Sequence, residues 1–122
     1  MTTFTKMQTV AVPVSDQDKS KALFEGLGLT EHMDAELQPG FRWVELSIPG
    51  GDTTLSLVLI GDDLPTGIDT GIRLLTADAR AAHELLAGTG CEVGELLDWE
   101  STPLMFSFLD LDGNRFYVSQ DS

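Results

Sequence analysis

The chain has 122 residues, which is enough for one well-buried core or for two small modules that share one. Seven basic and twenty acidic residues give a formal net charge of −13, a field that repels phosphate backbones and anionic membranes and argues against nucleic-acid or membrane partners. The apolar runs are strand-sized, the N-terminal stretch lacks the apolar region of a signal peptide, and the one cysteine excludes an intramolecular disulfide, so a cytoplasmic protein is the simplest interpretation.

The acidity has two explanations. A large net charge keeps a protein in solution, whatever its function. The same field attracts cations, so a cationic ligand would also account for it. The composition leaves both explanations open.

Alternating side chains over residues 7–14 predict a half-buried strand, with Val10, Val12 and Val14 on its more apolar side. Pro13 lacks a backbone donor, so it should lie near the end of this strand or on a sheet edge. A helix should follow, because Asp16 is a good N-cap and glycines at 26 and 28 would end it. Three further strands are predicted over residues 30–37, 41–48 and 54–59, the last two joined by a turn at Pro49-Gly50-Gly51-Asp52.

After a connecting loop over residues 61–70, the pattern starts again. Positions 62 residues apart match, among them Val10 with Ile72 and Asp16 with Asp78, and the closing hairpins match at a spacing of 61. The second hairpin turns at Asp112-Gly113-Asn114. The predicted fold is therefore α+β, with two βαβββ modules in tandem over residues 7–60 and 71–120 of a single domain.

One helix can cover only one face of a four-stranded sheet, so each module should leave the other face open. Two such faces curved toward each other would form a cup of mixed polarity, which suits a small molecule. Burial against a partner chain is an alternative use. The residues expected on the open faces are Thr9, Ala11, Trp43, Glu45, Ser47, Ser56, Val58, Gly71, Arg73, Leu75, Met105, Ser107, Arg115 and Tyr117.

This order of motifs resembles the vicinal oxygen chelate superfamily, which includes glyoxalases, extradiol dioxygenases and bleomycin-resistance proteins. The resemblance covers residues 7–120. It is carried by Val10-Ala-Val-Pro-Val-Ser-Asp16, by Arg42-Trp-Val-Glu45 and above all by Phe108-Leu-Asp-Leu-Asp-Gly-Asn-Arg-Phe-Tyr-Val118. The last stretch is similar to the closing Asp-Pro-Asp-Gly-Asn signature of the family, with Leu111 in place of the proline.

The resemblance implies a divalent metal held by four side chains, usually His or Gln on the first strand of each module and Glu on the last. In this sequence those positions fall on Thr9 and Gly71, and on Ser56 and Tyr117. None of the four supplies a carboxylate or an imidazole, which such a metal requires. We therefore expect no metal and no cofactor, and the resemblance points to the metal-free members similar to bleomycin-resistance proteins.

Glu45 and Tyr117 are the candidate catalytic residues. Glu45 is suited to act as a general base or to pair with a ligand cation, although an ion pair with Arg73 or Arg115 is the simpler explanation. Tyr117 is suited to donate a hydrogen bond to a ligand, but a tyrosine would also fill a vacated metal cavity. The aromatic residues have a similar alternative, since burial in a dimer interface would account for them. The predicted ligand-binding residues are Trp43, Glu45, Ser56, Arg73, Trp99, Met105, Arg115 and Tyr117.

Three other residues are assigned structural roles. His83 is interpreted as a solvated helix residue. His32, with Asp34 and Glu36, is interpreted as part of a solvated strand edge. Cys91 is expected in the core.

Three functions are compatible with these features. The leading hypothesis is a binding protein that sequesters a small molecule, such as a cationic antibiotic. The alternative is a lyase, isomerase or dioxygenase-type enzyme of the same superfamily. The third is a structural module whose cup is filled by its own side chains. A homodimer is expected under all three, because the resemblance implies modules paired across an interface.

Overall fold

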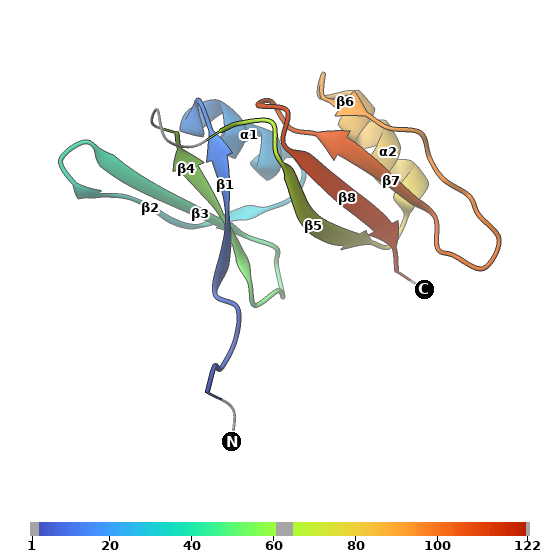
Figure 1. Cartoon of the computed structure of the whole chain (residues 1–122), viewed down its shortest axis with the longest axis horizontal. Coiled ribbons are helices and arrows are strands. Elements are labelled where there is room, and N and C mark those ends of the chain that lie inside the picture. Colours follow the sequence, from blue (N-terminus) through green and yellow to red (C-terminus); the bar gives the residue numbers. More distant parts are fainter. Residues whose placement is uncertain (1–2, 61–64, 122) are drawn as a thin grey trace. The chain divides into compact units, whose positions relative to one another are not determined.

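The computed structural model describes residues 3–60 and 65–121, and the chain divides into two compact units, residues 1–64 and 65–122. Each unit contains one helix and one four-stranded sheet (Figure 1). This arrangement confirms the predicted α+β class with two modules.

The first unit has the strand order β1-β4-β3-β2, in which β1 and β4 are parallel and the other pairs are antiparallel. Pro13 lies on the edge strand β1, as its missing donor predicts. The bounds are β1 Thr9–Val14, α1 Gln17–Gly26, β2 Thr30–Gln38, β3 Phe41–Ser47 and β4 Thr54–Leu59.

The second unit repeats this topology with the order β5-β8-β7-β6. Strand β5 begins at Asp69, inside the stretch expected to be a connecting loop. The bounds are β5 Asp69–Thr76, α2 Ala79–Ala87, β6 Glu92–Val93, β7 Met105–Leu109 and β8 Arg115–Gln120.

The helix ends confirm the internal repeat. The carboxylates of Asp16 and Asp78 accept hydrogen bonds from the backbone N–H groups of Lys19 and Ala81, so equivalent aspartates cap both helices. Gly28 and Gly90, the equivalent glycines after the helices, both have positive φ. Within the described residues, neither helix is long and apolar enough to cross a membrane.

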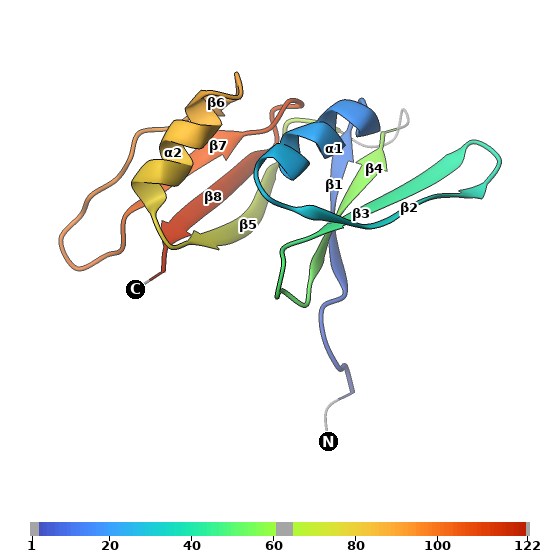
Figure 2. The same ribbon diagram turned by 180° about the vertical axis from the view of Figure 1, so that it is seen from behind.

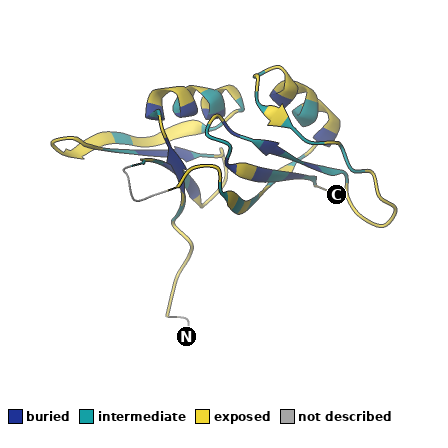
Figure 3. Cartoon of the chain, turned by 45° about the horizontal axis from the view of Figure 1, so that its top comes forward, coloured by how far each residue is buried: buried dark blue, intermediate teal, exposed yellow. Residues whose placement is uncertain are grey.

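Each helix packs on one face of its own sheet and buries the apolar side chains there (Figures 2 and 3). We call the opposite face of each sheet its open face. In the first unit, Phe24 of α1 lies in a core with Val12, Val44, Leu46 and Leu57. In the second unit, the rings of Phe108 and Phe116 stack with centroids 5.3 Å apart. Burial thus fixes which side chains each open face can present.

The β7–β8 turn is held by a buried network rather than by turn propensity alone. The Asp110 carboxylate accepts hydrogen bonds from the backbone N–H of Asn114 and from its side-chain amide, at 2.9 and 3.0 Å. The Asn114 side-chain oxygen accepts the backbone N–H groups of Gly67 and Ile68, just before β5. Asn114 is fully buried, so the motif joins the hairpin to the start of the unit.

Replacing Asn114 with Ala is expected to lower the free energy of unfolding by about 3 kcal/mol, because it removes the buried amide that accepts from the Gly67 and Ile68 N–H groups and donates to the Asp110 carboxylate. Leu111→Ala in the same turn is the control, since Leu111 is half exposed and should change stability by less than about 0.5 kcal/mol. Urea unfolding of both variants measures the difference. Equal stabilities would contradict the role of this network.

Candidate functional site

The open face of the first unit brings together several of the predicted site residues. The register pairs Glu45 of β3 with Ser56 of β4, and Ser56 with Ala11 of β1, so their side chains lie on one face. Trp43 is two residues before Glu45 on the same strand and shares this face. The Phe41 ring is beside it, with centroids 6.1 Å apart. An aromatic pair therefore lies next to a buried carboxylate.

Both oxygens of the Glu45 carboxylate have hydrogen-bond donors. Thr54 Oγ1 donates to Oε1 and Trp43 Nε1 donates to Oε2, each at 2.6 Å. Glu45 is 4% exposed, and these two bonds, chiefly the one from Thr54, hold its pKa below the ordinary value of 4.5. A positive charge on His32 would act in the same direction. The carboxylate is thus ionised at neutral pH and fixes the orientation of the Trp43 indole.

This geometry differs from the sequence-based alternative for Glu45, which was an ion pair with Arg73 or Arg115. The partners are instead Trp43 and Thr54, within the same sheet. Thr54 is a residue of this site that the sequence analysis missed. Its position two residues before Ser56 on one strand was the available signal, because alternate residues of a strand share a face.

The interpretation of His32, Asp34 and Glu36 as one solvated edge holds for His32 and Glu36, which are exposed on the edge strand β2, but not for Asp34. The register shifts between Glu31 and Met33, so residues on the two sides of His32 do not alternate simply. Asp34 pairs with Val44 on the helix-covered face, where Arg42 and Lys21 both bind its carboxylate at 2.8 Å. The bonds from Arg42 and then Lys21 hold the pKa of Asp34 far below its usual range.

The open face of the second unit carries the other predicted residues. Arg73 of β5 pairs with Tyr117 of β8, which pairs in turn with Ser107 of β7, and Arg115 and Met105 lie on the same face. The Arg73 guanidinium carbon lies 4.3 Å from the centre of the Tyr117 ring. Trp99 is not on this face: it lies in the loop between β6 and β7 and is 58% exposed.

Tyr117 donates its hydroxyl to the carboxylate of Asp69, which also accepts the backbone N–H of Gly71. The bond to Asp69 raises the pKa of Tyr117, and the same bond lowers the pKa of Asp69. The phenol is therefore a hydrogen-bond donor whose proton is firmly held. Asp69 was missed because the stretch containing it was expected to be a loop.

Two structural assignments made from the sequence were wrong. His83 is not a solvated helix residue: its Nε2 lies 2.9 Å from the carbonyl oxygen of Gly94, and its ring packs edge-on against Phe106. Cys91 is half-buried rather than fully buried in the core. The α2 helix packs on β6 and β7, which brings His83 to the strand end.

The four positions that would hold the metal of the superfamily do not fit a divalent cation. The hydroxyls of Thr9 and Ser56 are hydrogen-bonded to each other, Gly71 offers no side chain, and the Tyr117 hydroxyl is taken by Asp69. Such a cation needs several anionic oxygen or imidazole ligands. Within residues 3–60 and 65–121, no three His, Cys, Asp or Glu side chains are grouped to hold a metal ion.

Comparison with known proteins identifies the family. The Glyoxalase/Bleomycin resistance protein/Dioxygenase superfamily matches over residues 6–118. The chain belongs to this superfamily. The resemblance inferred from the Asp-Gly-Asn turn and the repeat is thereby confirmed, whereas a search of curated proteins gives no match.

Three solved structures show how similar the chain is to its relatives. TnmS3, an antibiotic binding protein from Streptomyces sp. CB03234, is 30% identical over 100% of both chains, with a TM-score of 0.86. A glyoxalase/bleomycin resistance protein from the same organism is 31% identical over 94% of this chain and 100% of its own, with a TM-score of 0.78. A superfamily member from Sphaerobacter thermophilus is 28% identical, covering 97% of this chain and 98% of its own, with a TM-score of 0.88.

The role of Thr54 is tested by Thr54→Val, which keeps the shape of the side chain but removes the donor to Glu45. The pKa of Glu45, followed by carbon-13 NMR of its carboxyl group, is expected to rise. At pH 7 the free energy of unfolding should fall by about 2 kcal/mol, as for a bond to a charged group. Because the folded-state pKa of Glu45 is lowered, this loss is fully present above the ordinary pKa of 4.5 and disappears as the pH falls through the folded-state value.

Thr53→Val is the matched control. Thr53 is the preceding residue and is exposed, and its hydroxyl donates to the carbonyl oxygen of Met7 instead of to a carboxylate. It should leave the Glu45 titration unchanged. A Glu45 pKa that moves equally in both variants would show that the Thr54 bond does not control it.

Proposed function

We propose that this protein binds a small molecule and sequesters it without a metal ion. The similarity to TnmS3 supports this proposal, because an antibiotic binding protein aligns with the whole chain at 30% identity. None of the residues at the four positions matched to the metal ligands of the superfamily has a carboxylate or an imidazole side chain. This supports the part of the proposal that excludes a metal ion.

The observation that carries the proposal is the state of Glu45 and Tyr117. A general base works best with a pKa near the operating pH, but the pKa of Glu45 is lowered and both its oxygens are bonded. Tyr117 has a raised pKa and donates to Asp69, which makes it a poor acid at neutral pH. Groups held in this way are suited to orient a ligand rather than to transfer protons.

The ligand in this proposal is an aromatic compound such as a cationic antibiotic. Trp43 and Phe41 provide a platform for stacking, with the indole fixed by the Glu45 carboxylate. The net charge of −13 attracts a molecule that carries positive charge overall. We further propose that the protein forms a homodimer, as the resemblance to the superfamily implies.

The alternative is a lyase, isomerase or dioxygenase-type enzyme of the same superfamily. It would need Glu45 or Tyr117 to exchange a proton with the substrate, or a metal held by ligands other than the four matched positions. Sequestration and catalysis differ in one outcome that can be measured: a sequestered ligand is recovered unchanged.

The proposal is tested by titrating the protein with bleomycin, a cationic antibiotic with aromatic rings, in a calorimeter, together with neutral aromatic antibiotics. We expect stoichiometric binding, protection of cells that express the protein, and unchanged mass of the recovered ligand. Trp43→Ala should weaken binding at least about tenfold, as for a buried aromatic contact. The control Leu111→Ala, in the β7–β8 turn, should bind as the unaltered protein does.

Absence of binding and of protection across this panel would contradict the binding proposal. A ligand recovered with altered mass would favour the enzyme. A transition metal found near one equivalent per chain, in protein purified without chelators, would contradict the metal-free part.

A further inference from the structure

Two arginines on the open face of the second unit carry charge that no neighbouring acid neutralises through an ion pair. Of the seven Lys and Arg residues, against twenty Asp and Glu, Lys21, Arg42 and Arg80 are in ion pairs, and Lys6 and Lys19 are exposed, away from the sheets, without one among the described residues. Within the described part of the chain, Arg73 and Arg115 have no carboxylate oxygen within 4.0 Å. In so acidic a protein, two such cations on one sheet face require an explanation.

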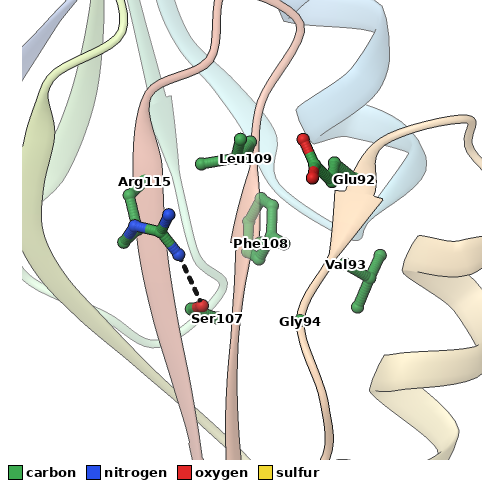
Figure 4. Close-up of a pocket in the computed structure, with 7 residues that line it drawn as sticks. All are labelled: Glu92, Val93, Gly94, Ser107, Phe108, Leu109 and Arg115. Atoms are coloured by element: carbon green, nitrogen blue, oxygen red, sulfur yellow. Dashed lines mark hydrogen bonds between the residues drawn. The ribbon is translucent and has the colours of Figure 1, made fainter.

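Neutral groups hold both guanidinium groups in place. Arg73 donates from Nη1 to the carbonyl oxygen of Gly71 at 2.8 Å while it lies over the Tyr117 ring. Gly71 has φ +70° at an irregular point of the β5–β8 register. Arg115 donates from Nη1 to Ser107 Oγ at 2.9 Å (Figure 4). These contacts orient the cations without cancelling their charge.

The nearest acid on this face, Asp69, is occupied by other partners. Its two carboxylate oxygens accept from the Tyr117 hydroxyl and from the Gly71 backbone N–H. Both arginines act on Asp69 only through space, where their charge helps to lower its pKa. The remaining N–H groups of Arg73 and Arg115 are thus free to bind an anion.

A shallow pocket of about 80 Å³ adjoins Arg115. The Leu109 side chain lines it on the open face, with the Ser107 hydroxyl beside the guanidinium (Figure 4). Val93 pairs with Phe108, so its side chain lies on the helix-covered face. Gly94 forms part of the rim, and a Cβ there would lie 3.1 Å from the backbone and side-chain oxygens of Ser107. The pocket also contains one acid, Glu92, which pairs with Leu109 across the β6–β7 ladder.

We propose that this face recognises a carboxylate group on the ligand, with Arg73 and Arg115 as the anion-binding residues and Leu109 against the body of the molecule. One guanidinium group binds a carboxylate through charge-assisted, often bidentate, hydrogen bonds, and a second cation on the same sheet face adds to the attraction. The inference rests on the proposed small-molecule function and refines its ligand: an aromatic molecule, positively charged overall, that also carries a carboxylate group for this face. The net charge repels anions at long range, so recognition depends on these two residues alone.

The sequence provides a specific reporter, because Tyr117 is the one tyrosine in the chain. Protein labelled with carbon-13 in the tyrosine ring gives NMR signals from this face only. It is titrated at low salt with 1-naphthoate, with neutral 1-naphthamide and with cationic 1-naphthylmethylammonium, which share one ring system and differ in charge. We expect 1-naphthoate to bind most tightly.

Arg73→Gln and Arg115→Gln should each weaken 1-naphthoate binding about fivefold or more, as for loss of a charge-assisted bond. Arg80→Gln is the matched control, since it removes the same charge from an exposed position on α2 that is paired with Asp98. It should leave the affinity unchanged. Glu92→Gln should strengthen binding, because it removes a negative charge from the pocket wall.

Tighter binding of the cationic compound, or equal affinity in Arg73→Gln, Arg115→Gln and Arg80→Gln, would overturn the carboxylate assignment and leave the binding function standing. Absence of any Tyr117 shift with all three compounds would also overturn it. Antibiotic titration and cell protection test the binding function separately, so failure of one proposal is distinguishable from failure of the other.

Discussion

The coverage of each four-stranded sheet by a single helix is the constraint on which the rest of the structure depends. The helix-covered face must be apolar, and strand alternation then assigns every second side chain to the open face. That face is where Trp43, Glu45, Arg73 and Tyr117 lie. Core packing therefore decides which residues are available to bind a ligand.

The two open faces differ in whether their charged side chains are buried or exposed. In the first unit, the Glu45 carboxylate is buried and both its oxygens are bonded to Trp43 and Thr54, which removes the cost of an unpaired charge. In the second unit, Arg73 and Arg115 are exposed and held by neutral groups. The buried carboxylate of the first unit thus fixes the orientation of an aromatic ring, whereas the guanidinium groups of the second unit are exposed to solvent.

The β7–β8 hairpin holds residues that stabilise the fold next to a residue of the candidate site. Asp110 and Asn114 build a buried network that joins the β7–β8 turn to the start of β5, so this part of the signature stabilises the fold. Tyr117, three residues further on, lies on the open face and bonds to Asp69. The fold and the candidate site therefore depend on different residues of one hairpin.

The sequence by itself determined the secondary structure, the repeat and the family, because these depend on periodicity, caps and turns that are encoded within a few residues. The capping aspartates, the Asp-Gly-Asn turn and the open-face positions of Glu45, Arg73 and Tyr117 were all predicted in this way. Only the tertiary structure decided which partners these side chains have. Thr54 and Asp69 meet Glu45 and Tyr117 through strand pairing, and the bulge at His32 changes which side chains share a face. Such contacts join residues that are 9 and 48 positions apart, and their geometry follows from register, which the pattern of a single strand does not contain.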